Sequence, residues 1–405
     1  MSLPRLVVVD GVRTPFCKWN THFAGLGADE LGRVAVDALL TRTGIDPNLI
    51  DEVIFGCVCQ PAEASNVARV IALRAGIPEK VPAVTVHRNC ASGFEAVTQA
   101  FERMAAGCGS VFVVGGAESM SQVPLLYQPA AAKKFATLGA AKSTGKKLAA
   151  FSRFRPWDFE PRPALKLGLT DPISGMNMGE TAELLAREQG ISREEQDRFA
   201  QQSHERALAA REKLAEEICP VYVKGHAITE DNGPRADATP AALGKLKPVF
   251  DRKFGTVTAG NSSQISDGAV ALLVMTEQKA EKLGFTPLGR LTSYAYTGCD
   301  PARMGLGPVS AIRKTGRALA DADLIEINEA FAAQVLAVLR VLGNVPEEKL
   351  NVNGGAIALG HPVGATGARL VLSALKELPR RKAHRALVSL CVGGGQGGAL
   401  WLERD

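Results

Sequence analysis

Short apolar runs alternate with amphipathic segments over the first 120 residues. The apolar runs are short and rich in valine and isoleucine, which predicts buried β-strands. These predicted strands are residues 5–12, 51–58, 83–86 and 110–118. Between them, apolar residues recur every three or four positions, which predicts helices. These predicted helices are residues 29–42, 66–76 and 92–107. The alternation is typical of an α/β protein, in which helices cover a sheet.

The same pattern returns in the last third of the chain, after a sheet-like stretch at 255–275. The predicted strands are 287–296, 324–327, 386–392 and the final residues 399–405, and the predicted helices are 307–319, 328–342 and a helix from about 364. The order strand, polar loop, helix, strand, glycine pair occurs at 83–116 and again at 350–394. We interpret this as an internal duplication whose corresponding loops face one shared cleft.

The middle of the chain departs from this pattern. Residues 121–157 contain seven Lys or Arg and no Asp or Glu. Three interpretations of the basic segment 131–155 stay open: a solvated surface, a docking site for phosphates or for a partner, and a contact with a membrane surface. A strong helix follows at 191–217, where Ser192 and Glu195 have capping-box spacing. We therefore expect residues 121–250 to form an insertion between sheet elements.

Composition limits the classes of function. A chain of 405 residues is long enough for two or three domains. Its net charge of +5 is too modest to indicate nucleic-acid binding but fits an anionic substrate. The eight cysteines have neither disulfide nor zinc spacing, so we expect no metal and a reducing, cytoplasmic location. We see no signal peptide and no apolar run of the ~20 residues that span a membrane.

Cys90 lies between a predicted strand and a predicted helix, in "NCASG". A cysteine at a helix N-terminus faces unpaired amide N–H groups and the positive end of the helix dipole, which both stabilise a thiolate. The small residues after it leave room for a substrate. Cys90 is therefore a candidate nucleophile, and a buried structural cysteine is the alternative.

His361 and Asn328 are candidate partners of such a nucleophile. His361 stands in "ALGHPVG", a glycine-rich turn that presents an imidazole from a loop, and a Cys–His pair would give an activated thiol. Asn328, in "EINEAF", follows an apolar strand, where an amide can hold a water or donate to an oxyanion. The alternative for Asn328 is a plain helix N-cap.

Cys391 begins "CVGGGQGG", in which Gly393, Gly395 and Gly398 have the spacing of a dinucleotide-binding loop. That motif requires a helix after the loop and an acidic residue about 20 positions further on. Here the chain ends at Asp405, and "ALWLERD" has the pattern of a strand. We therefore reject the dinucleotide interpretation and expect the glycines to offer bare backbone N–H groups near a reacting carbonyl.

Taken together, these segments resemble the thiolase family. The resemblance covers nearly the whole chain, in family order. The matching segments are "NCASG" (89–93), "GGAESMS" (115–121), "MGETAE" (178–183), "TVTAGNSSQISDGA" (256–269), "DPARMGLGP" (300–308), "NEAFAAQ" (328–334), "NVNGGAIALGHPVGATGAR" (351–369) and "CVGGGQG" (391–397).

The resemblance implies a five-layer αβαβα arrangement of two duplicated domains with an inserted loop domain. It implies an N-terminal domain of residues 1–120 plus 251–285, a loop domain of 121–250, and a C-terminal domain of 286–405. Thiolases interconvert 3-ketoacyl-CoA plus CoA with acyl-CoA plus acetyl-CoA. No tightly bound cofactor is implied, because coenzyme A and acetyl-CoA are substrates.

The resemblance also implies roles for single residues. Cys90 would hold the acyl group as a thioester. His361 would accept its proton, and Asn328 would hold a water in the oxyanion hole that it shares with His361. Cys391 would be the acid/base for the α-carbon of acetyl-CoA or for incoming CoA. The N–H groups of Cys90 and Gly393 would form a second oxyanion hole.

By the same resemblance, six residues line the pantetheine arm of CoA: Ser263, Ala259, Met304, Met178, Ala330 and Phe331. The subtype stays open between a longer-chain degradative thiolase, similar to the β-subunit of trifunctional fatty-acid oxidation complexes, and a short-chain acetoacetyl-CoA thiolase. Asn177 stands where many short-chain thiolases have histidine, whereas the trifunctional group often has histidine where Asn328 stands. A homodimer or homotetramer is implied, and a hydratase/dehydrogenase partner subunit stays open.

Three rival classes are weighed against a thiolase. A ketoacyl synthase would need a second histidine in place of Asn328. A non-catalytic lipid-binding relative would be expected to lose a reactive residue. A Cys–His–Asn hydrolase would leave Cys391 and its glycines unexplained.

Overall fold

The computed structural model describes residues 4–343 and 345–405, which form two compact units. Of the described residues, unit 1 comprises 4–122, 171–343 and 345–405, and unit 2 comprises Val123–Thr170. Unit 2 is shorter than the 121–250 expected for the insertion. Residues 171–250 pack with unit 1 instead, and the wider division into three domains stays a prediction.

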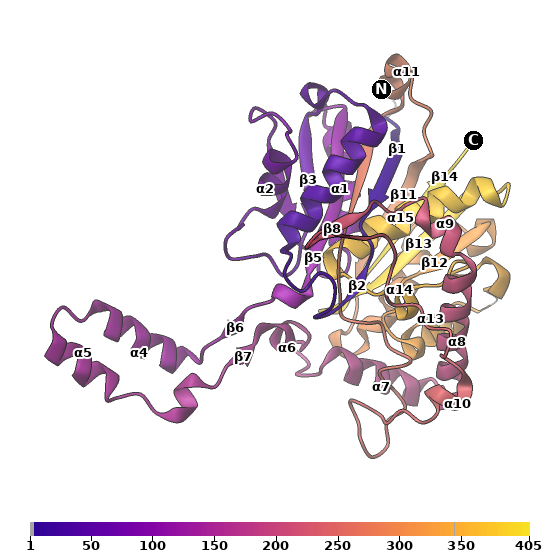
Figure 1. Cartoon of the computed structure of the whole chain (residues 1–405). Helices are drawn as coiled ribbons and strands as arrows, with labels where there is room; N and C mark the ends of the chain where they lie inside the picture. Colours follow the sequence, from indigo (N-terminus) through magenta and orange to yellow (C-terminus); the bar gives the residue numbers. More distant parts are fainter. Residues whose placement is uncertain (1–3, 344) are drawn as a thin grey trace. The chain divides into compact units, whose positions relative to one another are not determined.

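Unit 1 is built on one large mixed sheet (Figure 1). Its strands are β1 (Leu6–Arg13), β2 (Cys17–Lys18), β3 (Glu52–Gly56), β4 (Ala83–Val86), β5 (Val111–Ser119), β10 (Ser266–Thr276), β11 (Gly289–Gly298), β12 (Leu324–Ile327), β13 (Arg385–Val392) and β14 (Gln396–Glu403). The strand order is β12-β13-β14-β11-β1-β10-β5-β3-β4, and β2 pairs with β10.

The two halves of this sheet repeat one topology. In the order β1-β10-β5-β3, two antiparallel pairs are followed by a parallel pair, and β11-β14-β13-β12 has the same sequence of pairings. The halves join where β1 pairs with β11 through Val7–Arg290 and Val8–Gly289. The duplication predicted from the sequence is therefore confirmed.

Helices complete the five layers. Those that cover the sheet are α1 (Ala28–Thr43), α2 (Val67–Arg74), α3 (Ser92–Ala105), α12 (Gly307–Lys314), α13 (Ala332–Leu342) and α15 (Val363–Arg380). Helices α1 and α2 cover the outer face of the first half-sheet, and α12 and α13 cover the outer face of the second. Helices α3 and α15 pack against each other and against both halves. The α/β five-layer class is confirmed.

Side chains alternate between these layers as the period of a strand requires. On β5, Val111 and Val113 face α1 and α2, whereas Phe112 and Val114 face α3 and α15. Because both faces are covered, the strands are almost continuously apolar, and this is why the sequence revealed them.

Most of the remaining elements of unit 1 lie between β5 and β11 in the sequence. They are α7 (Met178–Glu188), α8 (Arg193–Ala209), α9 (Arg211–Ala215), β8 (Val221–Val223), β9 (His226–Ile228), α10 (Pro240–Leu243), α11 (Glu277–Leu283) and α14 (Ala356–Leu359). Helix α7 packs on α13, and α8 packs on α13 and α14.

Two predicted elements begin later than expected. The strand predicted within 255–275 begins at Ser266, and residues 256–265 form a loop. The helix predicted from Asn328 begins at Ala332, because Phe331 is extended (φ −147°) and bridges to Ser262. Both corrections concern segments whose partners are distant in sequence, as Ser262 and Phe331 are.

Unit 2 is a small unit of short elements. They are β6 (Leu125–Leu126), α4 (Pro129–Ala140), α5 (Thr144–Phe151), β7 (Arg162–Pro163) and α6 (Ala164–Gly168). Helices α4 and α5 pack against each other, and β6 pairs with β7 (Figure 1).

Candidate active site

The candidate site lies where the first turns of α3 and α15 cross. Gly93 of α3 approaches the backbone of Gly364 and Ala368 of α15 so closely that an added methyl group would collide with the Ala368 nitrogen. Cys90 and His361 each stand three residues before the glycine of their own helix. The duplicated fold therefore brings together two residues that are 271 positions apart in the sequence.

Cys90 sits in a loop that backbone N–H groups surround. Asn89 has a positive φ of 42°, and its side chain donates to the Gly393 carbonyl oxygen at 2.7 Å. The Cys90 thiol is partly exposed. Burial raises the pKa of this thiol, and the N–H groups of Gly393 and of Cys90 itself oppose that effect.

The expectation that the helix terminus stabilises a Cys90 thiolate is therefore only half met. The donors are present, but desolvation outweighs them, so Cys90 is a neutral thiol at neutral pH. A thiol in this state needs a base nearby to become a nucleophile.

His361 has the properties of such a base. It is buried, and its Nδ1 lies 2.6 Å from the Thr366 hydroxyl oxygen, which itself donates to the Pro362 carbonyl at 3.0 Å. We therefore assign the proton to Nδ1, which leaves the Nε2 lone pair free to accept. Burial, with the nearby Arg369 charge, lowers the pKa of His361 to about 4, so the imidazole is neutral at pH 7.

Asn328 lies beside this imidazole. Its Nδ2 is 3.4 Å from His361 Nε2, and its backbone N–H donates to the Ser389 carbonyl at 2.9 Å. The N-cap alternative for Asn328 is wrong, because Phe331 is the N-cap of α13. The buried Asn328 Oδ1 has no hydrogen-bond partner among the described residues. It is an acceptor that a water or a substrate group can satisfy.

Cys391 is buried near the end of β13 and belongs to the same site. Burial raises its pKa well above the ordinary value, and the nearby Cys90 raises it further. After Cys391 the chain turns through Gly394 and Gly395, which have φ of 87° and 80°, into β14. These glycines form the turn of a β-hairpin, and a strand rather than a helix follows them. This agrees with the prediction that the segment is not a dinucleotide-binding loop.

A buried clamp holds the segment that carries His361 against the segment that carries Asn328. The Glu329 carboxylate accepts from Ser203 Oγ at 2.6 Å, from Asn351 Nδ2 at 2.9 Å and from the Ile357 N–H at 3.2 Å. The Ser203 hydroxyl oxygen in turn accepts from the Gly355 N–H at 3.1 Å. Four separate segments therefore meet at one carboxylate directly after Asn328.

Five of the six residues expected along pantetheine lie near this centre. Met178, Met304, Ala330 and Phe331 share one apolar cluster with Cys391, and the Ser263 N–H donates to the Ala330 carbonyl at 2.9 Å. The sixth, Ala259, is exposed in the loop before β10. No contact that we observe ties Ala259 to the other five.

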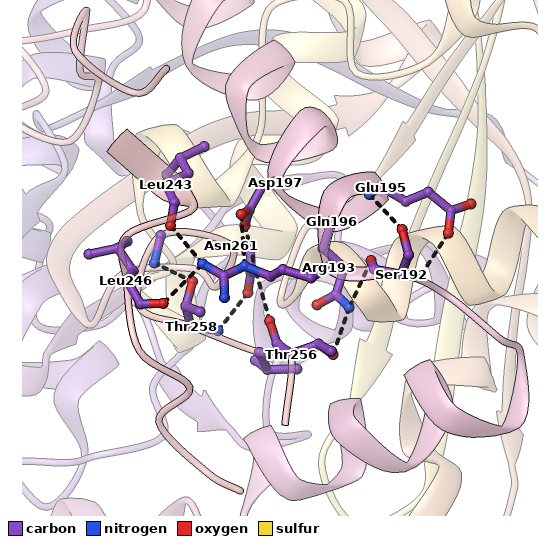
Figure 2. Close-up of polar contacts among 12 residues, drawn as sticks. Ser192, Arg193, Glu195, Gln196, Asp197, Leu243, Leu246, Thr256, Thr258 and Asn261 are labelled. Atoms are coloured by element: carbon purple, nitrogen blue, oxygen red, sulfur yellow. Dashed lines mark hydrogen bonds and ion pairs between the residues drawn. The ribbon is translucent and has the colours of Figure 1, made fainter. Parts of the chain in front are cut away.

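A polar network anchors the loop that carries Ala259 and Ser263 (Figure 2). Asn261 Nδ2 donates to Asp197 at 2.9 Å, and its Oδ1 accepts from the Thr258 N–H at 2.8 Å. Gln196 donates to the Thr256 hydroxyl at 2.9 Å. Arg193 binds Asp197 at 2.7 Å. Its guanidinium also donates to the carbonyl oxygens of Leu243, the last residue of α10, and of Leu246. Helix α8 thus fixes the loop beside the site.

An open pocket of about 530 Å³ lies along α7. Its lining residues are Met176, Glu180, Glu183, Arg187, Phe250, Asp251, Arg252 and Lys253. The Phe250 ring meets Phe331 edge to face at 6.1 Å, so the pocket adjoins the apolar cluster of the site. Three of these residues are cations and three are carboxylates. Arg187 pairs with Asp251 at 3.4 Å, and the two glutamates accept backbone N–H groups, so Arg252 and Lys253 are the groups that favour an anionic ligand.

Family models match almost the whole chain. Residues 6–278 match the thiolase N-terminal domain, and residues 285–404 match the thiolase C-terminal domain. The chain belongs to the thiolase family.

Similar proteins agree with this assignment. This thiolase is 42% identical to a 3-ketoacyl-CoA thiolase of Serratia proteamaculans, over 98% of this chain and 97% of that protein. It is 44% identical to an acetyl-CoA acetyltransferase of Pseudomonas aeruginosa, over 99% of both chains.

Solved structures show the same fold. An acetyl-CoA acetyltransferase of Bacillus anthracis superposes with a TM-score of 0.90 at 39% identity, over 99% of both chains. Human mitochondrial 3-ketoacyl-CoA thiolase in complex with CoA superposes with a TM-score of 0.89 at 38% identity, over 100% of this chain and 98% of that one. The protein is therefore an acyltransferase with thiolase activity.

Two further residues of this thiolase matter that sequence reasoning did not single out. Glu118 accepts from the N–H groups of Cys59 (2.8 Å), Val58 (3.1 Å) and Gly364 (2.8 Å), and so joins the loop after β3 to the first turn of α15. Its signal in the sequence is an acid near the end of an otherwise apolar strand, β5. Ser203 gave no comparable signal, because it lies within a long polar helix.

Asn177 departs from the pattern of many short-chain thiolases and has a local role here. It is the N-cap of α7, where its side chain accepts from the Gly179 N–H at 3.0 Å and Glu180 completes a capping box. It thereby fixes the start of the helix that carries Met178. Within residues 4–343 and 345–405, no helix combines the length and the apolar character that crossing a bilayer requires.

Proposed function

We propose that this thiolase cleaves a 3-ketoacyl-CoA with CoA into acyl-CoA and acetyl-CoA, or runs the reverse condensation, through an acyl group on Cys90. The observation that supports the proposal is that four groups lie in two neighbouring pairs, Cys90 with Cys391 and Asn328 with His361, on segments beside one helix crossing. They are the Cys90 thiol, the neutral Nε2 of His361, the unpartnered Oδ1 of Asn328 and the buried thiol of Cys391.

The first half-reaction transfers the acyl group to the enzyme. His361 Nε2 takes the Cys90 proton while the sulfur adds to the 3-keto carbon. The bond between the second and third carbons then breaks, and the Cys391 thiol gives its proton to the α-carbon that leaves as acetyl-CoA. The N–H groups of Cys90 and Gly393 stabilise negative charge on one carbonyl oxygen, and His361 with a water on Asn328 stabilises it on the other.

The second half-reaction releases the acyl group. The Cys391 thiolate takes the proton of incoming CoA, the CoA sulfur attacks the Cys90 thioester, and Cys90 leaves with the proton that His361 returns. Two thiols of raised pKa suit this exchange, because neither is held as a permanent anion.

The CoA moiety is proposed to enter along the cluster of Met178, Met304, Ala330 and Phe331, with Ser263 and Ala259 on the loop beside it. Arg252 and Lys253 at the rim of the adjoining pocket are proposed to attract its phosphates. We further propose a cytoplasmic homo-oligomer, dimer or tetramer. A hydratase/dehydrogenase subunit that supplies the ketoacyl substrate would fit this chemistry.

The test is intact-mass analysis after mixing the protein with acetyl-CoA. We expect an acetyl adduct on Cys90, absent in Cys90→Ala and retained in the matched control Cys108→Ala, whose thiol is exposed. Cys391→Ala should still be acetylated but should fail in condensation. An unmodified wild-type protein would refute the proposal and favour a non-catalytic relative.

A short-chain acetoacetyl-CoA thiolase is the second candidate, favoured by the 44% identity to the Pseudomonas acetyltransferase. We propose longer acyl chains because the segments "SNVAR" (65–69), "EDNGPR" (230–235) and "LKPVF" (246–250) resemble those of trifunctional β-subunits. Thiolysis rates across ketoacyl chains of four to sixteen carbon atoms separate the two, since a short-chain enzyme would lose activity beyond four.

A further inference from the structure

The hairpin after Cys391 turns on three consecutive glycines, Gly393, Gly394 and Gly395. Glycine has no side chain to pack, and its backbone has more conformational freedom than that of any other residue. The Gly393 N–H group nevertheless acts on the Cys90 thiol as a hydrogen-bond donor. A donor that stabilises developing charge works best when it is held in place before the reaction begins. The turn therefore needs contacts from other segments to hold it.

Hydrogen bonds from two other segments hold this turn. On one side, the Cys299 N–H group donates to the Gly395 carbonyl oxygen at 2.7 Å. On the other side, Asn89 Nδ2 donates to the Gly393 carbonyl oxygen at 2.7 Å. The second bond comes from the residue directly before Cys90, so it joins the loop of the proposed nucleophile to the turn.

Asn89 makes this contact from a strained backbone conformation. Its φ of 42° lies in the left-handed region, which glycine adopts freely and asparagine tolerates better than most residues. The Asn89 carbonyl oxygen accepts from the Ser92 hydroxyl at 2.7 Å and from the Ser92 N–H at 3.0 Å. The Arg88 N–H donates to the same hydroxyl at 2.9 Å. Strain that neighbouring groups enforce in this way is concentrated at functional loops.

Arg88 holds the same loop against the first residue of β14. Its guanidinium lies over the Tyr296 ring, 4.2 Å from the ring centroid. Its Nε binds the Glu95 carboxylate at 2.5 Å, and its Nη1 lies 3.4 Å from Gln396 Oε1. The loop therefore contacts the hairpin at two levels, through Arg88 at β14 and through Asn89 at the turn.

We propose that Asn89 is a positioning residue whose side-chain amide holds the Gly393 N–H group in the oxyanion hole beside Cys90. The inference rests on the function proposed above, in which the N–H groups of Gly393 and Cys90 stabilise charge on a substrate carbonyl oxygen. Only two soft dihedral angles separate the N–H and the C=O of one residue, so fixing the Gly393 carbonyl restrains its N–H. Asn89 thus acts through Gly393 and not on the reacting atoms.

A role in forming the turn alone fits less well. Asn20 is a residue of that kind, with a φ of 57° and an exposed side chain. For such a turn the backbone conformation is sufficient, and glycine would serve equally well. The Asn89 side chain instead makes a hydrogen bond that spans 304 positions of the sequence and ends at the hairpin of the second thiol.

The first test replaces Asn89 by glycine, which adopts a positive φ but lacks the amide. Acetylation of Cys90 by acetyl-CoA, measured by rapid quenching and intact mass, should slow about tenfold to a hundredfold in Asn89→Gly. The value of kcat should fall by a similar factor with little change in KM. Asn89→Asp should be slower still, because a carboxylate cannot donate to the Gly393 carbonyl and adds negative charge beside the oxyanion hole. Asn20→Gly is the matched control and should keep the wild-type rate.

A second measurement needs no turnover. The Gly393 N–H group lowers the pKa of Cys90, so Asn89→Gly should move the pH dependence of Cys90 alkylation by iodoacetamide to higher pH. At one alkaline pH, the rate should fall about twofold to tenfold. The exposed Cys108 in the same digest should react as in the wild type. The urea midpoint of Asn89→Gly should stay close to that of the wild type, because glycine relieves the strain at this position.

Three outcomes would overturn the proposal. The first is wild-type acetylation and kcat in Asn89→Gly. The second is slower acetylation with an unmoved alkylation curve, which would place the effect away from the Gly393 N–H group. The third is lost activity together with a lowered urea midpoint, which would make Asn89 a structural turn residue. A wild-type protein that is never acetylated would refute the proposed function instead, and alkylation would still test the contact.

Discussion

The two thiols and the imidazole of the active site are kept neutral by burial. Desolvation raises the pKa of Cys90 and of Cys391 and lowers that of His361 to about 4. An ion pair of thiolate and imidazolium is therefore not the resting state. The Cys90 proton passes to His361 only when a substrate carbonyl is present for the sulfur to attack. Between turnovers the neutral thiol is a weak nucleophile and is therefore protected from side reactions.

This state predicts the pH dependence of Cys90 alkylation. Below the pKa of a thiol, its thiolate fraction rises tenfold for each unit of pH. Because burial places the pKa of Cys90 above the ordinary value, its reaction with iodoacetamide should climb into the alkaline range without a plateau near neutrality. Peptide mass spectrometry measures this rate, with the exposed Cys108 as a reference in the same digest. A neutral plateau that disappears in His361→Asn would instead reveal an ion pair.

At the scale of elements, the site depends on how separate segments are fastened. Glu329 joins α8, the Asn351 turn and α14 directly behind Asn328, and Glu118 joins the β3 loop to the start of α15. These carboxylates are positioning residues, because they reach the reacting groups only through the backbone that they hold. Burial raises the pKa of both, and the hydrogen bonds that they accept oppose this shift.

Ser203→Ala tests the clamp. It removes a hydroxyl that donates to a buried glutamate, which should cost about 1–3 kcal/mol of unfolding free energy and lower kcat about tenfold to a hundredfold with little change in KM. Ser373→Ala is the matched control, because Ser373 is buried and donates to Glu217 at 2.9 Å. It should lose similar stability but keep kcat. Equal loss of kcat in both variants would contradict a positioning role for Ser203.

The packing of α15 on β5 makes a second prediction at this scale. A methyl group on Gly116 would overlap the Gly364 carbonyl oxygen of α15, so Gly116→Ala should destabilise unit 1 by about 3 kcal/mol. Gly25→Ala is the control, since open space surrounds that position. It should change the unfolding free energy by less than about 0.5 kcal/mol. Urea denaturation measures both, and a tolerated Gly116→Ala would show that α15 can move away from β5.

At the scale of the whole molecule, buried histidines couple folding to pH. His361 and His204 are both buried, and the pKa of each is lowered from 6.5 to about 4, chiefly by burial. The unfolded chain therefore binds more protons than the folded one between these values. Stability contributed by these groups is present above pH 6.5 and is lost as the pH falls toward 4.

His204 lies outside the reacting groups and isolates this effect. Between about pH 7 and about pH 5, its titration should remove about 2 kcal/mol of unfolding free energy, and His204→Gln should lack that contribution. The exposed His226→Gln serves as the control and should lose as much stability on acidification as the wild type. Urea denaturation at the two pH values gives the comparison. An unchanged pH dependence in His204→Gln would place that histidine in contact with solvent.

The sequence by itself determined the elements, the duplication and the family. Strands β1, β4, β5 and β13 lie within one residue of their predicted positions, because strands covered on both faces are continuous apolar runs. The order of motifs identified the thiolase family from "NCASG" to "CVGGGQG". These signals are local, since each depends on neighbouring residues alone.

Only the tertiary structure decided what depends on distant partners. The late start of α13, the clamp on Glu329 and the neutral state of Cys90 all follow from groups more than sixty residues away or from burial. The hairpin after Cys391 became meaningful once its Gly393 N–H was seen to face the Cys90 sulfur. Desolvation and long-range hydrogen bonds arise only when the chain is folded, so they cannot be predicted from a short stretch of sequence.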